Sequence, residues 1–151
     1  METPEITPED LIYMETVEKF HNWKHTARSV QPQCEETIRN LENLLEHFSH
    51  CFKEGSVYFR APKYPEALCK KLRKELEDRV KLAQDVEKTL NQLIEEGTGY
   101  DVHGDEFDTL LDVMKDLATL ESKLSRIIGR ASYYLELSEG KEGGQGVSDH
   151  G

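Results

Sequence analysis

The sequence predicts an all-α protein, an elongated antiparallel bundle of three long helices whose first helix is kinked near Pro32. Apolar residues recur every three or four positions through three stretches, which is the spacing of one buried face on a helix. Gly and Pro interrupt this pattern at residues 55–65 and 97–104, where we expect connections. Charged residues make up 32% and apolar residues 36% of the 151 residues, a balance typical of long helices that bury a narrow stripe.

The first helix is expected to begin at Thr7 and Pro8. Thr7 can cap the helix, Pro8 suits the first helical position, and the acids that follow complement the positive end of the helix dipole. The apolar positions that follow are spaced by three and four residues: Val17, Phe20, Trp23, Ala27, Val30, Cys34, Ile38, Leu41, Leu45, Phe48 and Phe52.

Pro32 lies in the middle of this first stretch. A proline inside a helix removes one hydrogen bond and crowds the carbonyl four residues earlier, at a cost of ~3 kcal/mol. Two structures fit: one long helix kinked at residues 28–32, or two antiparallel helices joined by a turn there, which would give a four-helix bundle. The apolar spacing stays in phase through Pro32, and residues 30–33 contain no Gly, Asn or Asp, which favours the kinked helix.

The second and third helices are expected at residues 66–96 and 105–138, with lengths of ~47 and ~51 Å at ~1.5 Å per residue. The apolar positions of the second are Leu68, Leu72, Leu76, Val80, Ala83, Val86, Leu90, Leu93 and Ile94. Those of the third are Phe107, Leu110, Leu111, Met114, Leu117, Leu120, Leu124, Ile127, Ile128, Ala131, Tyr134 and Leu135. We expect one bundle over residues 7–139, with a disordered N-terminus at 1–6 and a disordered Gly-rich tail at 140–151.

Charge and composition argue against several classes of function. A net charge of -11 opposes binding to nucleic acid or to an anionic membrane, and no apolar run approaches the ~18 residues of a membrane span. The first five residues are acidic and lack the apolar core of a signal peptide. We therefore expect a cytoplasmic protein in which Cys34, Cys51 and Cys69 are reduced thiols.

Four histidines are the candidate metal ligands. His21 and His25 share one helix face, and His47 and His50 form a second cluster, so either pair has a spacing that can chelate zinc. The di-iron pattern of helical bundles needs Glu-x-x-His from two helices, and only His21 fits it. We interpret the histidines as surface residues, with a metal-binding bundle as the alternative. No catalytic motif is present, so we expect neither an enzyme nor a cofactor.

The most basic stretch contains Lys70, Lys71, Arg73 and Lys74, which are the candidate surface for an anionic partner. Acids are interleaved with these bases, and residues 62–97 are neutral overall. A solvated helix face therefore explains the stretch better than a binding surface does.

The combination of three heptad-patterned helices with Trp23 in the first resembles a spectrin-type repeat over residues 8–138. The residues that carry the resemblance are Trp23 with Phe20, Ala27 and Val30, and the apolar stripes from Leu68 to Ile94 and from Phe107 to Leu135. The resemblance implies association with a scaffold or with the cytoskeleton. We accordingly expect a non-enzymatic structural or protein–protein interaction module that binds another protein by helix-face packing.

Overall fold

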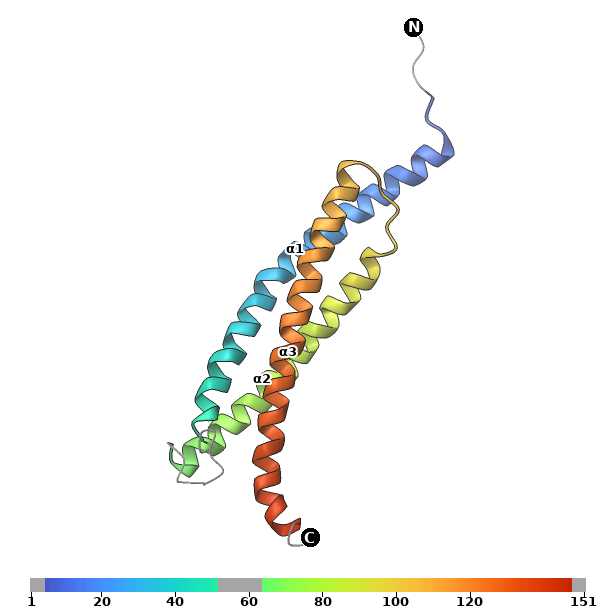
Figure 1. Ribbon diagram of the computed structural model, residues 1–151. Helices are drawn as coiled ribbons and strands as arrows, with labels where there is room; N and C mark the ends of the chain where they lie inside the picture. Colours follow the sequence, from blue (N-terminus) through green and yellow to red (C-terminus); the bar gives the residue numbers. More distant parts are fainter. Residues whose placement is uncertain (1–4, 52–63, 148–151) are drawn as a thin grey trace.

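The computed structural model describes residues 5–51 and 64–147, and within them the chain forms three helices and no strand (Figure 1). The helices are α1 (Pro8–Ser49), α2 (Glu66–Gly97) and α3 (Asp105–Val147). α1 and α3 run in the same direction, α2 runs in the opposite one, and each helix packs against both others along a rod-shaped molecule. The prediction of an elongated, all-α three-helix bundle is confirmed.

The start of α1 is fixed by local chemistry. The Thr7 hydroxyl oxygen accepts a hydrogen bond from the Asp10 amide at 3.1 Å, and the Asp10 carboxylate accepts one from the Thr7 amide at 3.0 Å. This reciprocal capping box satisfies two amides that would otherwise lack partners at the helix end. Pro8 is the first helical residue, where its missing N–H breaks no hydrogen bond.

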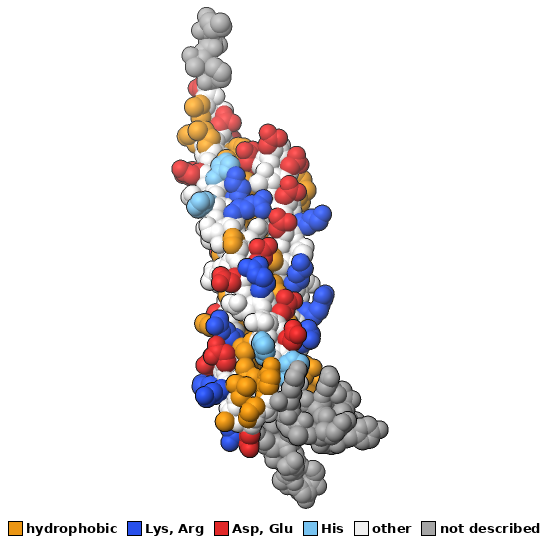
Figure 2. Space-filling model, turned by 90° about the vertical axis from the view of Figure 1, so that its left-hand side faces the viewer, with side chains coloured by type: hydrophobic (Ala, Val, Ile, Leu, Met, Phe, Trp, Pro, Cys, Tyr) orange, Lys and Arg blue, Asp and Glu red, His pale blue; other side chains and the backbone are white. Residues whose placement is uncertain are grey.

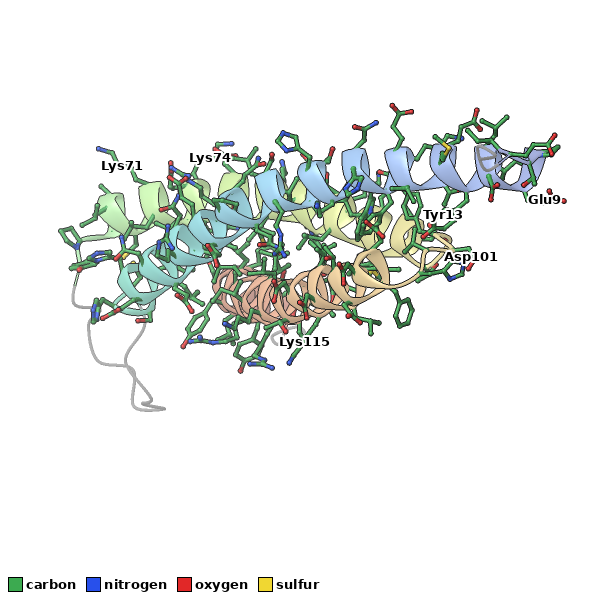
Figure 3. All side chains as sticks on the ribbon, turned by 90° about the horizontal axis from the view of Figure 1, so that it is seen from above. Glu9, Tyr13, Lys71, Lys74, Asp101 and Lys115 are labelled. Carbon is green, nitrogen blue, oxygen red and sulfur yellow. The ribbon has the colours of Figure 1, made fainter. Side chains whose placement is uncertain are left out.

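Pro32 lies inside α1, which continues to Ser49 as one helix. The four-helix alternative with a turn at Pro32 is therefore wrong. Ala27 and Cys34, on either side of the proline, are both completely buried, so packing on one face continues through it and offsets the lost hydrogen bond. The axis of α1 changes direction between its N-terminal and C-terminal halves (Figures 1 and 3), as a helix with an internal proline is expected to do.

The core is a continuous apolar stripe along the three helices. Of the side chains that we expected to be buried, Trp23, Leu41, Leu45, Leu117 and Leu124 are buried, whereas Leu72 and Val86 are only partly buried at its margin.

The phase of the first turns of α3 differs from the expected one. Val113 is completely buried, although the expected stripe omitted it, whereas Phe107 and Leu111 are 44% and 52% exposed. The reason is that the buried positions of α3 follow a strict alternation of three and four from Leu110 through Val113 to Leu117.

Trp23 joins the three helices at one end of the bundle. Its indole Nε1 donates a hydrogen bond of 2.9 Å to the carbonyl oxygen of Leu93 in α2, and its ring stacks on Phe20 with centroids 5.8 Å apart. The ring lies directly against Gly97: a Cβ on this glycine would be 2.7 Å from the Trp23 ring and 2.5 Å from the sulfur of Met114 in α3. Only a residue without a side chain leaves room for this junction.

The ends of the bundle differ in part from the expected boundaries. Residues 98–104 connect α2 to α3, and Gly104 precedes α3 with a φ of +62°, a conformation that favours glycine. α3 continues to Val147, past the expected limit at residue 139, because residues 140–147 contain no proline and glycine weakens a helix without removing its hydrogen bonds. Residues 1–4, 52–63 and 148–151 lie outside the described part of the chain.

We expect Gly97→Ala to destabilise the protein by about 1–3 kcal/mol, because the rigid Trp23 ring cannot move away from the new methyl group. Gly129→Ala is the matched control: no atom lies within 4 Å of the new Cβ, so removal of a helix-interior glycine should stabilise by about 0.5–1 kcal/mol. Chemical denaturation measures both changes, and a Gly97→Ala variant at least as stable as the wild type would contradict the packing described for Gly97.

We expect Pro32→Ala to stabilise the protein, by up to ~3 kcal/mol, because alanine restores the hydrogen bond to the Arg28 carbonyl in a helix that already continues through this position. The side chain of Pro32 is exposed, so little packing is lost. The midpoint of chemical denaturation tests the sign, and a lower midpoint would indicate that the bend itself is needed for packing.

Candidate functional site: an acidic end and a cationic groove

The candidate metal ligands do not converge. His21 and His25 are exposed on α1, and about 33 Å of helix separates His25 from His47. Both His47 and His50 contact Tyr64: the His47 Nδ1 lies 3.2 Å from its hydroxyl oxygen, and the His50 ring packs edge-on against its ring. Among the described residues, no group of three or more His, Cys, Asp or Glu is arranged to hold a metal ion.

The basic stretch at the start of α2 faces solvent. Figure 3 shows Lys71 and Lys74 pointing away from the bundle. The ion pairs of the stretch are Lys70–Glu66 at 3.8 Å, Arg73–Glu77 at 3.7 Å, Lys74–Asp78 at 3.2 Å and Arg73–Glu139 at 3.1 Å. All but the last connect residues one helical turn apart, which supports the interpretation as a solvated face.

The cysteines are free thiols, and the pKa values of two of them, Cys34 and Cys51, are raised. Burial, followed by the charge of Glu35, raises the pKa of Cys34 to about 11. Burial raises the pKa of Cys51 to about 12, with hydrogen bonding to Cys69 and its charge as further causes. A thiol reacts as a nucleophile through its thiolate, so Cys34 and Cys51 are poor nucleophiles at neutral pH.

The start of α1 projects past the start of α3 (Figure 1). Tyr13 ties this segment to the 98–104 connection: its ring stacks on His103 with centroids 5.2 Å apart, and its hydroxyl oxygen accepts a 3.0 Å hydrogen bond from the His103 amide. In Figure 3, Tyr13 points toward the connection that carries Asp101, and Glu9 lies near the free end of the helix. The exposed apolar side chains at this end are Ile6, Leu11, Ile12, Met14, Phe107 and Leu111.

The same end holds most of the negative charge. Residues 5–24 and 91–112 contain twelve Asp and Glu against two Lys, a net charge of -10, and the rest of the chain is nearly neutral at -1. On the face that Figure 2 shows, acidic side chains surround the upper part of the molecule. Burial and the carboxylate of Glu96 raise the pKa of Tyr100 within this region. We call residues 5–24 and 91–112 the acidic end.

A groove of about 470 Å³ lies between the C-terminal half of α1 and the middle of α3. Four cationic side chains line it, Arg39 from α1 and Lys123, Arg126 and Arg130 from α3, together with Glu35 and Glu42. None of the four cations makes an ion pair or a side-chain hydrogen bond with another described residue. Ile38, Leu120 and Ile127, each 8% exposed or less, also line it. We call this set of residues the cationic groove.

Sequence reasoning missed both surfaces. Each is built from segments that are far apart in the chain, so the net charges of residues 1–61, 62–97 and 98–151, which are -5, 0 and -6, conceal one end at -10. The signal that was present is the spacing of Lys123, Arg126 and Arg130, which places three cations on one face of a helix.

Two carboxyl groups face one another across α2 and α3 in the middle of the bundle. Burial, a hydrogen bond to Glu87 and the charge of Glu87 raise the pKa of Glu121 above its ordinary value. Two carboxyl groups can share a hydrogen bond only when one of them keeps its proton.

A scan against protein-family models and searches of curated proteins and of solved structures found no match to this chain. The spectrin-type resemblance therefore stays a prediction, and function has to be argued from the geometry. In the part of the chain that the structure describes, no helix combines the length and the apolar character needed to cross a membrane.

We expect Glu121→Gln to stabilise the protein at pH 7, because the amide removes a like charge and donates a hydrogen bond to Glu87. The raised pKa means that the folded state binds more protons than the unfolded state above pH 4.5, so this pair costs stability as pH rises through that range. The denaturation midpoints of the wild type and of Glu121→Gln should diverge between pH 4 and pH 7, with the variant becoming the more stable of the two toward pH 7. If the midpoints of the two proteins changed with pH in parallel, the interaction between Glu121 and Glu87 would be contradicted.

Proposed function

We propose that the chain is a non-enzymatic interaction module that binds another protein by packing the projecting start of α1 against it. In the cell this activity would belong to a scaffold or cytoskeleton-associated protein in the cytoplasm, as the spectrin-type resemblance implies.

One observation carries the proposal: an amphipathic helix extends beyond its own bundle with its apolar side chains exposed. Ile12 is 64% exposed and Leu11 and Met14 are more than half exposed, on a helix whose end is already stabilised by a capping box. Clustered exposed apolar side chains rimmed by charge are typical of surfaces that bind a partner. Because the helix is preformed, binding does not require the ordering of a flexible segment.

The charge of the acidic end favours a partner that presents Lys or Arg beside apolar residues. Complementary charge raises the rate of encounter and selects against partners of the same sign. Neither the thiols nor the histidines supply an arrangement that favours catalysis over binding, because the raised pKa values of Cys34 and Cys51 favour their protonated forms and the histidine pairs lie apart along α1.

The test compares Ile12→Asp with Leu82→Asp, which makes the same substitution at a similarly exposed position of α2, 57% exposed and outside the acidic end. Tagged wild type and both variants are expressed in cells, and bound proteins are quantified by mass spectrometry. We expect Ile12→Asp to lose partners that wild type and Leu82→Asp retain, and higher salt to weaken their capture.

Both substitutions are on the surface, so circular dichroism should show unchanged helix content. Identical sets of bound proteins for all three forms would contradict the proposal.

A further inference from the structure

We propose that one partner of the projecting start of α1 is a second copy of the same chain, bound by its cationic groove. This inference rests on the proposed function, because it names the occupant of the surface described there. The proposed contact joins two surfaces of the described chain. The projecting start of α1 carries exposed apolar side chains and a surplus of acids, and the cationic groove carries a surplus of cations.

Charge complementarity is the first argument. The projecting segment carries Glu9, Asp10, Glu15 and Glu18 with no Lys or Arg before Lys19. The groove holds four cations against two carboxylates, and its cations have no ion pairs within the described chain. An acidic segment that entered the groove would pair cations that are otherwise unpaired.

The distribution of charge also selects the orientation. Two acidic ends brought together would place two net charges of -10 in contact, whereas the acidic end of one copy against the groove of another places opposite charges together. A head-to-tail arrangement is therefore favoured over a two-fold symmetric one through the acidic ends.

Shape supports the same pairing. The start of α1 projects past the start of α3, so it can reach another molecule without displacing its own helices (Figure 1). Ile38, Leu120 and Ile127 at the floor of the groove are each 8% exposed or less, so Leu11, Ile12 and Met14 would pack against the aliphatic stems of the Arg and Lys side chains that flank them.

A head-to-tail contact that the bound copy does not return leaves one free groove and one free projecting helix at the ends of every open assembly. Such an interface does not close on itself unless the rotation completes a ring. The wild-type protein should then form species larger than a dimer as concentration rises, rather than stop at two copies.

Sedimentation equilibrium tests the association at fixed physiological salt, up to about 1 mM protein, where weak interfaces become populated. We expect the weight-average mass of the wild type to rise above the 17.4 kDa of one chain, without a plateau at twice that value. The groove variant Arg126→Glu/Arg130→Glu should lower the association constant by about tenfold or more. The control variant Lys81→Glu/Lys88→Glu makes the same change of charge on exposed positions of α2 and should associate as the wild type does.

Complementation decides the arrangement. The groove variant keeps an intact projecting helix, and the helix variant Leu11→Asp/Ile12→Asp keeps an intact groove. Each should be monomeric alone, but an equimolar mixture should form a one-to-one heterodimer, because the mixture contains one intact copy of each surface.

A monomeric wild type at all concentrations, equal effects of the groove and control substitutions, or a mixture that stays monomeric would each overturn the inference. None of these results bears on the cellular partners lost by Ile12→Asp, so the failure of self-association and the failure of the proposed function remain distinguishable.

Discussion

The packing of Trp23 against Gly97 fixes how the helices of this bundle are aligned. The indole donates to the Leu93 carbonyl, and its ring fills the space that the missing Gly97 side chain leaves beside Met114 of α3. Apolar heptads alone allow helices to slide by one repeat, since each repeat presents similar side chains. A large ring with one hydrogen-bond donor fits against a glycine and the Leu93 carbonyl at one register only, so this junction selects the alignment that the rest of the stripe then buries.

The exposed start of α1 follows from this alignment. Trp23 lies at the level of Leu93, after which α2 has four residues left, about 6 Å, whereas α1 extends from Trp23 back to Pro8, about 22 Å. The ion pair of Arg28 with Asp116 places the beginning of α3 short of that end as well. The projecting helix is thus a consequence of unequal helix lengths measured from one fixed point, and the contact of Tyr13 with His103 supports its base.

The sequence was sufficient for the elements of the fold and insufficient for the surfaces. The spacing of apolar residues on both sides of Pro32 predicted one helix, and Thr7 with Asp10 predicted where it begins, because both signals are local. The burial of Val113 was missed, since the adjacent apolar residues Val113 and Met114 give two possible phases and only the neighbouring helices choose between them. The sequence predicts only that Gly97 ends a helix. Its contact with Trp23 could not be predicted, because the two residues are 74 positions apart in the chain. The cationic groove depends in the same way on the approach of Arg39 to Arg126 and Arg130.

Some carboxylates of the acidic end stabilise the helix in which they lie, whereas others destabilise it and need another explanation. Glu9 and Asp10 at the start of α1, and the three acids in the first turn of α3, face the positive ends of their helix dipoles and are favourable there. Glu95 and Glu96 lie in the last turn of α2, where the dipole is negative and no base is present, so they oppose the stability of that helix. Their mutual repulsion with the acids of α1 and α3 is a cost that folding does not recover. A cationic surface bound at this end would reduce that repulsion, which connects the charge distribution of the free protein to the binding role that its projecting helix supports.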